Sequence, residues 1–187
     1  MTTVLIIGLF SLSYELEVLL KQEGLSCKAI SVKNLDQYNP KEHLVIVPYL
    51  SNFIREDLYN KAIKHGFKPF TYVSSNATYT SKYPPGAGSI IFPGVYVGYN
   101  TKIAIGTILM PNVVVSHDSV IEEYSYISPG VNIASFVTVS KNCFLGIGAT
   151  IKPRIILPPS SKLGAGANLT KNFTIKSTFI GNPAKNI

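Results

Sequence analysis

Between Ile91 and Ile175 an aliphatic residue returns at every sixth position, fifteen times in succession. An α-helix repeats its apolar positions about every 3.6 residues and a half-buried strand every two, so neither element explains this period. A repeat of six is typical of a β-helix solenoid, in which each hexad forms a short strand and a corner. The repeated residues are Ile91, Val97, Ile103, Leu109, Val115, Ile121, Ile127, Ile133, Val139, Leu145, Ile151, Leu157, Leu163, Leu169 and Ile175.

The other positions of the hexad support this interpretation. Two residues before each aliphatic position stands, in most hexads, a small or β-branched residue that suits a crowded interior corner. Three residues after it stands, in ten of the fifteen hexads, glycine, asparagine or aspartate, the residue types that tolerate the left-handed backbone of a sharp turn. With three hexads for each triangular coil, the fifteen hexads predict about five coils. The expected corner residues are Gly94, Asn100, Gly106, Asn112, Asp118, Gly130, Asn142, Gly148, Gly166 and Asn172.

The residues before the repeat alternate between strand-like and helix-like patterns. The expected elements are strands at 4–7, 26–32, 44–47 and 67–73, and helices at 11–23 and 52–64. For the first helix, Ser11 or Ser13 is the expected N-cap and Gly24 the expected end. This order predicts a small Rossmann-like α/β unit with a mainly parallel sheet.

In such a unit the turn after the first strand is a common nucleotide-binding site. Here the turn begins at Gly8, and the second and third glycines of the dinucleotide fingerprint are missing, which argues against NAD. Gly8, Ser11 and Asp36 remain candidate substrate-binding residues, because Ser11 can donate to a phosphate or ribose and Asp36 can accept from a ribose hydroxyl. Helix capping and loop roles for the same residues stay open.

Segment 74–88 is rich in serine, proline and glycine and has little periodicity, which is typical of a connection between domains. We therefore expect an α/β substrate domain at 1–78 and a solenoid domain with a C-terminal tail at 79–187. The solenoid should run to about Phe179. Because solenoids need covered ends, the α/β unit and the irregular tail at 181–185 should cover them.

Composition limits the kinds of partner. The 17 basic residues exceed the 10 acidic ones, which gives a formal charge of +7, but no run of five like charges occurs. A nucleic-acid surface is therefore poorly supported. The late basic residues suit either a phosphorylated small ligand or an ordinary solvated surface. They are Lys152, Arg154, Lys162, Lys171 and Lys176.

Cysteine content and hydropathy indicate the compartment. Cys27 and Cys143 are too few for a disulfide framework, and Cys143 occupies a small interior position of a hexad. Both are expected to be reduced packing residues of a cytoplasmic protein. No apolar stretch reaches the length of a membrane span.

His117 is the sharpest candidate for catalysis, because it is the only histidine in the repeat region and is followed directly by Asp118. The equivalent positions of other hexads carry Pro93, Pro111, Pro129 and Pro153. A histidine beside a carboxylate suits general-base catalysis, since the carboxylate orients the imidazole and stabilises the charge formed on proton transfer. A solvated turn histidine beside a corner aspartate remains the alternative.

The hexads, the pair His117-Asp118, the segment 142–146 and the end 181–185 together resemble the left-handed β-helix acyltransferases that use acetyl-CoA. With the small α/β domain in front, the chain resembles the bacterial sugar acetyltransferases that include sialic acid O-acetyltransferase and the UDP-4-amino-sugar N-acetyltransferase. The resemblance covers nearly the whole chain and is most specific in the solenoid.

This resemblance implies a homotrimer with three active sites between neighbouring solenoids, acetyl-CoA as the acyl donor and no metal. It implies that His117 takes a proton from a sugar amine or hydroxyl, with Asp118 as its acidic partner. It also places Tyr126, Ile147 and Ala165 where related enzymes contact acetyl-CoA.

The acceptor is left open. Related enzymes carry a histidine where this chain has Tyr126 and a histidine-containing Gly-rich loop where it has Gly8, so the nucleotide is not fixed. The amino group of a nucleotide-linked amino sugar is the first expectation and O-acetylation of a sugar the second. A non-catalytic trimeric scaffold or sugar-binding module is the alternative of another class. A zinc site of the carbonic anhydrase type is rejected, because it needs three convergent histidines and His43 and His65 lie in the α/β domain.

Overall fold

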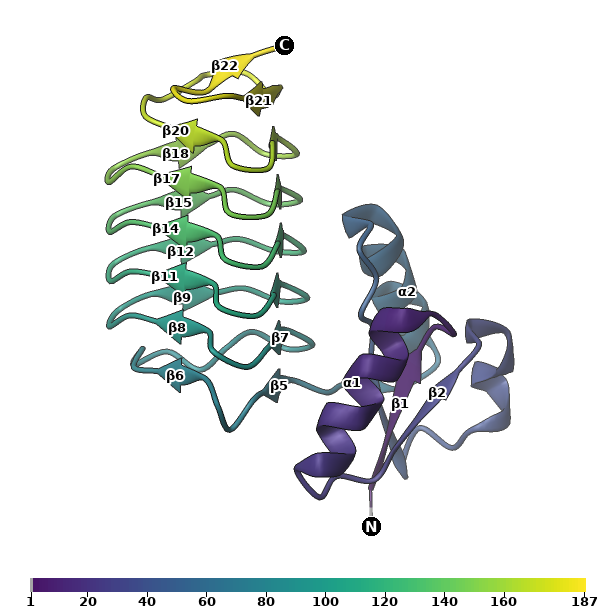
Figure 1. Ribbon diagram of the computed structural model, residues 1–187. Helices are drawn as coiled ribbons and strands as arrows, with labels where there is room; N and C mark the ends of the chain where they lie inside the picture. The colour runs from purple at the N-terminus through teal and green to yellow at the C-terminus, as the bar shows by residue number, and fades with distance from the viewer. Residues whose placement is uncertain (1) are drawn as a thin grey trace. The chain divides into compact units, whose positions relative to one another are not determined.

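The computed structural model describes residues 2–187, and the chain divides into two compact units at Thr71 and Tyr72. The first unit is an α/β unit, and the second is a β-solenoid, whose stacked coils are visible in Figure 1. Among residues 2–187 we find no helix with the length and apolar character needed to cross a membrane.

The α/β unit contains a four-stranded parallel sheet in the order β2-β1-β3-β4. Its elements are β1 (Thr3–Ile7), α1 (Ser11–Gln22), β2 (Cys27–Ile30), the 3-10 helix η1 (Val32–Gln37), β3 (His43–Ile46), α2 (Asn52–Lys64) and β4 (Lys68–Pro69). The central strand β1 is buried from Val4 to Ile7, as its aliphatic run predicts. The parallel sheet and both α-helices are therefore confirmed, whereas η1 was not expected.

Two details of this unit correct the sequence-based expectations. Neither serine caps α1, because Ser11 is its first helical residue, Phe10 occupies the N-cap position and Ser13 is fully buried. The strand expected at 67–73 is two strands, because β4 ends at Pro69 and β5 (Tyr72–Val73) pairs with a solenoid strand. Gly24 does end α1, with a φ of 79° directly after the C-cap residue Glu23.

The solenoid has three faces, each a sheet of short strands of two or three residues that pair in parallel, except for β22 at the end of face 1. Face 1 contains β5 (Tyr72–Val73), β7 (Ile90–Ile91), β10 (Ile108–Leu109), β13 (Tyr126–Ile127), β16 (Phe144–Leu145), β19 (Lys162–Leu163), β21 (Thr178–Ile180) and β22 (Lys185–Asn186). Face 2 contains β6 (Thr78–Tyr79), β8 (Tyr96–Val97), β11 (Val114–Val115), β14 (Asn132–Ile133), β17 (Thr150–Ile151) and β20 (Asn168–Leu169). Face 3 contains β9 (Lys102–Ile103), β12 (Val120–Ile121), β15 (Thr138–Val139) and β18 (Ile156–Leu157).

The hexad residues form the core. Fourteen of them, from Ile91 to Leu169, are at most 4% exposed, and partners in adjacent coils are eighteen residues apart, as Ile91 and Leu109 are. The fifteenth, Ile175, was expected inside but is 64% exposed. Phe179 is buried on face 1, where it pairs with Leu163 sixteen residues earlier, so the last coil is two residues shorter than the others. Phe179 packs against Phe173, with ring centroids 4.4 Å apart.

The ends of the solenoid also differ from expectation. The first coil begins at Tyr72, because β5 and β6 pair with β7 and β8. The boundary therefore lies before Tyr72 and not after residue 78, and irregular segment 74–88 is part of the first coil. At the other end β22 pairs antiparallel with β21, and Ala184 is buried in the core cluster, so the tail covers this end as an ordered hairpin.

Most corners of the solenoid carry a residue of positive φ. Corner 1–2, between faces 1 and 2, carries Gly94, Asn112, Gly130, Gly148 and Gly166. Corner 2–3 carries Asn100, Asp118, Phe136 and Arg154, and corner 3–1 carries Gly88, Gly106, Tyr124, Asn142 and Ser160. The nine expected positions up to Gly166 are confirmed, but Asn172 is not in this conformation and instead accepts the Ile156 N–H through its Oδ1.

Both cysteines pack in the interior. Cys27 and Cys143 are buried, and neither forms a disulfide with another residue of 2–187. Burial raises the pKa of the Cys143 thiol to about 12, so the thiolate that makes a cysteine reactive is disfavoured there. The packing role expected for Cys143 is therefore confirmed.

Candidate active site

Corner 2–3 places the catalytic candidates on a rigid framework. Strand β11 ends at Val115, and the chain then turns through Ser116, His117 and Asp118 before β12 begins. Asp118 has a φ of 57°, a conformation that aspartate tolerates better than most residues, and its N–H donates to the Tyr99 carbonyl of the coil below. The backbone of the corner is thus fixed on both sides of the candidate histidine.

The His117 ring faces Asp118 with one nitrogen and leaves the other available. Nδ1 lies 2.7 Å from Asp118 Oδ2. Because an ionised carboxylate only accepts hydrogen bonds, this contact assigns the proton of the neutral ring to Nδ1 and the lone pair to Nε2. The His117 side chain is 53% exposed, so a ligand can reach Nε2. This arrangement fits a general base.

The carboxylate of Asp118 is held by a second donor. Asn100, one coil below at the same corner, donates through Nδ2 to Asp118 Oδ1 at 2.6 Å. The hydrogen bonds from Asn100 and His117 lower the pKa of the Asp118 carboxyl below its ordinary value, with a smaller contribution from the charge of Lys82. Asp118 therefore stays ionised at neutral pH, as a partner of an imidazolium must.

The rest of the corner supports the ring. Phe136, one coil above Asp118, meets the His117 ring edge-on, with centroids 5.4 Å apart. The Arg154 guanidinium lies 4.6 Å from the centroid of the Phe136 ring. Gly98 lies beneath the turn so closely that a Cβ there would be 2.6 Å from the backbone nitrogen of His117. The histidine is therefore oriented by packing as well as by Asp118.

The three residues expected to contact acetyl-CoA lie elsewhere on the solenoid. Ile147 and Ala165 stack on each other at corner 1–2, where Gly166 N–H donates to the Ile147 carbonyl, and both are exposed. Tyr126 lies on β13 of face 1, is 6% exposed and stacks parallel to Phe144 at 5.6 Å. The structure thus brings Ile147 and Ala165 together, but it does not bring them to His117 within one chain.

The expected substrate residues of the α/β unit are also separate from one another. Gly8 has a φ of 131°, and the Phe10 ring covers it so closely that a Cβ on Gly8 would be 2.2 Å from the ring. Ser11 is exposed at the start of α1. Asp36 lies on η1 and contacts His65 Nε2 at 3.1 Å. These placements leave the role of Gly8, Ser11 and Asp36 a prediction.

The late basic residues do not form one patch. Arg154 belongs to corner 2–3, Lys162 lies on face 1, and Lys171 follows β20, where it lies 5.3 Å from the centroid of the Phe173 ring. The interpretation as scattered surface charges therefore fits this distribution better than a single phosphate site.

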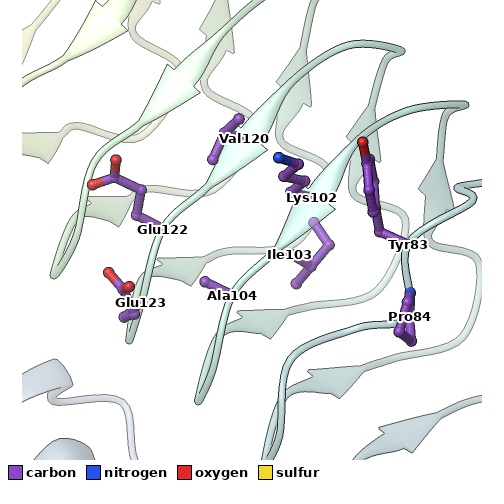
Figure 2. A pocket seen from close by; sticks show the side chains of 8 residues that line it. All are labelled: Tyr83, Pro84, Lys102, Ile103, Ala104, Val120, Glu122 and Glu123. Carbon is purple, nitrogen blue, oxygen red and sulfur yellow. The ribbon is translucent and has the colours of Figure 1, made fainter.

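A cavity of about 570 Å³ opens on face 3. Figure 2 shows its lining, which comprises Tyr83, Pro84, Lys102, Ile103, Ala104, Val120, Glu122 and Glu123. Two of its charged groups have contacts within the chain: the Lys102 ammonium lies 4.9 Å from the centroid of the Tyr83 ring, and the Glu122 carboxylate accepts the Lys141 N–H. The cavity lining does not include His117 or Asp118, so it is distinct from the candidate catalytic pair.

The sequence pointed to His117 and Asp118 but missed their supports. Asn100 was expected only as a corner residue, and Phe136 was not singled out. The spacing of eighteen residues, three hexads, was the available signal, because it aligns Asn100, Asp118, Phe136 and Arg154 at one corner.

No family model and no curated protein matches the sequence. The acetyltransferase domain of PglB from Neisseria gonorrhoeae matches the structure with a TM-score of 0.93 and 20% identity, covering 99% of both chains. PerB from Caulobacter crescentus, solved with CoA and GDP-perosamine, matches with a TM-score of 0.93 and 22% sequence identity, covering 99% of this chain and 97% of that one. WeeI from Acinetobacter baumannii matches with a TM-score of 0.93 and 22% sequence identity, covering 100% of both chains. The chain therefore has, over nearly its whole length, the same two-unit fold as these proteins.

Proposed function

We propose that this protein is an acetyl-CoA-dependent acetyltransferase that acts on the amino group of a nucleotide-linked amino sugar. The observation that carries the proposal is the exposed His117 ring, whose Nδ1 is held by Asp118 and whose Nε2 is available. The shared fold supports it, because the PglB domain has been solved with acetyl coenzyme A and PerB with CoA and GDP-perosamine. Acetylated amino sugars of this kind serve surface-polysaccharide or glycoconjugate biosynthesis, and we place the enzyme in the cytoplasm.

In the reaction the acceptor nitrogen attacks the thioester carbonyl carbon of acetyl-CoA, and His117 Nε2 takes the proton that the nitrogen loses. The positive charge that forms on the ring lies next to the ionised Asp118 carboxylate, which stabilises it. The tetrahedral intermediate then collapses, the carbon–sulfur bond breaks, and CoA thiolate leaves. The products are the N-acetyl sugar and CoA.

We expect the working form to be a homotrimer of left-handed solenoids. Ile147 and Ala165 lie at corner 1–2, whereas His117 lies at corner 2–3, so one chain alone separates the expected acetyl-CoA contacts from the base. A neighbouring subunit whose corner 1–2 faces corner 2–3 of the first would join the two. Tyr126, on the adjoining face, would border the same cleft.

In the α/β unit we expect Gly8, Ser11 and Asp36 to bind the nucleotide, in a Rossmann-like manner. Gly8 and Ser11 flank the start of α1, where helix N–H groups favour phosphate. The Phe10 ring covers Gly8, so a phosphate can approach this backbone only if the ring turns away.

The decisive experiment compares wild-type protein with His117→Ala in a CoA-release assay. The acceptors are UDP-, GDP- and dTDP-linked 4-amino sugars and free sialic acids, and products are identified by mass spectrometry. His117→Ala should lower kcat about 10²- to 10⁴-fold, the usual contribution of a general base. His43→Ala is the matched control, because His43 begins β3 in the other unit, and it should leave turnover unchanged.

The outcomes separate the alternatives. Equal turnover of wild type and His117→Ala would exclude the general-base role. Hydroxylamine cleaves acetyl esters more readily than amides, so a product lost on this treatment would show O-acetylation, the second choice. If no acceptor reacts, the scaffold or sugar-binding alternative gains support.

A further inference from the structure

We propose that Asn100 is a positioning residue of the acetyl-transfer site, which acts through Asp118 to set the tautomer and orientation of His117. This inference rests on the proposed function only for its kinetic consequence. Its structural part concerns three side chains of corner 2–3, and it can be tested without any substrate.

The contacts form a chain that ends at the base. Asn100 Nδ2 donates to Asp118 Oδ1 at 2.6 Å, and His117 Nδ1 lies 2.7 Å from Asp118 Oδ2. Each carboxylate oxygen therefore has its own donor, and the two donors lie on neighbouring coils. Two hydrogen bonds fix the plane of a carboxylate, whereas one leaves it free to rotate about its Cβ–Cγ bond.

The orientation of the Asn100 amide follows from this contact. An amide oxygen facing the carboxylate would be repelled, so the nitrogen must point to Asp118. The amide oxygen is then buried, and within residues 2–187 it accepts no hydrogen bond.

Other asparagine corners show that the backbone alone does not explain this contact. Asn112 at corner 1–2 and Asn142 at corner 3–1 have the same left-handed conformation as Asn100, with φ of 61° and 57°. The residues one coil above them are Gly130 and Ser160, neither of which carries a carboxylate. At corner 2–3 the corresponding residue is Asp118, beside the one histidine of the solenoid.

The first test measures the tautomer of the His117 ring by long-range ¹H–¹⁵N NMR of histidine-labelled protein at a pH where the ring is neutral. In wild type the proton should reside on Nδ1. In Asn100→Gly, which keeps a residue suited to positive φ, we expect a shift toward the Nε2–H form that free imidazole side chains prefer. Asp118→Asn should disturb the tautomer too, whereas Asn142→Gly, the matched corner control, should leave it as in wild type.

The second test is a double-mutant cycle on kcat with the acceptor identified above. Asn100→Gly should lower kcat about tenfold without changing the KM for acetyl-CoA, a fraction of the roughly 100-fold that a 1 Å misplacement costs. If Asn100 acts through Asp118, the same substitution should have no further effect in the Asp118→Asn background. A merely structural role of Asn100 would give equal losses in both backgrounds.

The two tests fail in different ways. An unchanged tautomer in Asn100→Gly, or full additivity in the cycle, overturns the positioning role and leaves the acetyltransferase proposal intact. If wild-type protein shows no acetyl transfer while the tautomer changes as expected, the positioning role stands and the proposed function fails.

Discussion

Corners 2–3 and 1–2 of the solenoid share the left-handed backbone conformation but differ in their side chains. The φ values are 57° to 63° at Asn100, Asp118, Phe136 and Arg154, and 61° to 74° along corner 1–2. Corner 1–2 uses glycine at every position except Asn112, whereas corner 2–3 uses none. A side chain in left-handed conformation costs about 1–2 kcal/mol, less for asparagine and aspartate. Corner 2–3 is therefore less stable than a glycine corner would be, but its side chains hold His117. Corner 1–2 exposes its backbone, which a ligand can approach.

The largest effects should come from displacing one corner at a time. A Cβ at Gly98 would lie 2.6 Å from the backbone nitrogen of His117, and a Cβ at Gly146 would lie 2.6 Å from the backbone nitrogen of Ala165. Gly98→Ala should therefore move the base and lower kcat about 100-fold, the typical cost of a 1 Å misplacement. Gly146→Ala should move Ala165 and raise the KM for acetyl-CoA more than it lowers kcat. Steady-state kinetics of both variants checks this.

The pair controls for folding, because both alanines meet backbone atoms of the next coil. Thermal unfolding should show similar losses of stability in the two variants. The division of labour between the corners is contradicted if both variants change kcat and KM in the same proportion.

Much of the fold follows from the sequence because the period of six is set by local geometry. Each aliphatic residue of the repeat from Ile91 to Leu169 is buried inside the coil to which its own hexad belongs. The presence of an aliphatic residue at every sixth position is therefore enough to predict burial. The rule fails at the ends, where tertiary contacts replace the repeat. Ile175 keeps the spacing but is exposed, because the last coil departs from the repeat and Phe179 pairs with Leu163 on face 1 only sixteen residues further along the chain. At the other end the aliphatic repeat is broken at Tyr79 and Pro85, yet β5 and β6 pair with solenoid strands.

The site could be predicted only as far as adjacent residues determine it. His117 and Asp118 are neighbours in sequence, and their hydrogen bond is local. The contacts with Asn100 and Phe136 join different coils; the eighteen-residue spacing tells which corner residues stack, but not which of their side-chain atoms meet. The covering of Gly8 by Phe10 depends on side-chain packing in the α/β unit, which the glycine pattern does not report.

A smaller effect should measure what a side chain costs at a corner. Gly130 has a φ of 69° and open space around its Cβ position, so Gly130→Ala introduces backbone strain without a clash. We expect the free energy of unfolding to fall by about 1 kcal/mol. Asn112→Gly at the same corner is the reverse control and should change it by less than about 0.5 kcal/mol. Urea denaturation measures both free energies. If Gly130→Ala were as stable as wild type, the free-energy cost assumed above for side chains at positive φ in corner 2–3 would be contradicted.

The smallest effect should be the pH dependence contributed by Asp118. Its pKa is lowered, first by the hydrogen bond from Asn100 and then by that from His117, from an ordinary value of 3.8. A lowered carboxyl pKa adds stability that is present above the ordinary value and is lost as pH falls through the folded-state value. The stability difference between wild type and Asn100→Gly should therefore be constant near neutral pH and shrink below about pH 4. The free energy of unfolding, measured from pH 7 to pH 3 with Asn142→Gly as control, checks this. If the difference between wild type and Asn100→Gly did not depend on pH, Asn100 would not act on the charged carboxylate. Because corner 1–2 has no ionisable group at its left-handed positions, Asn112→Gly should show no such dependence.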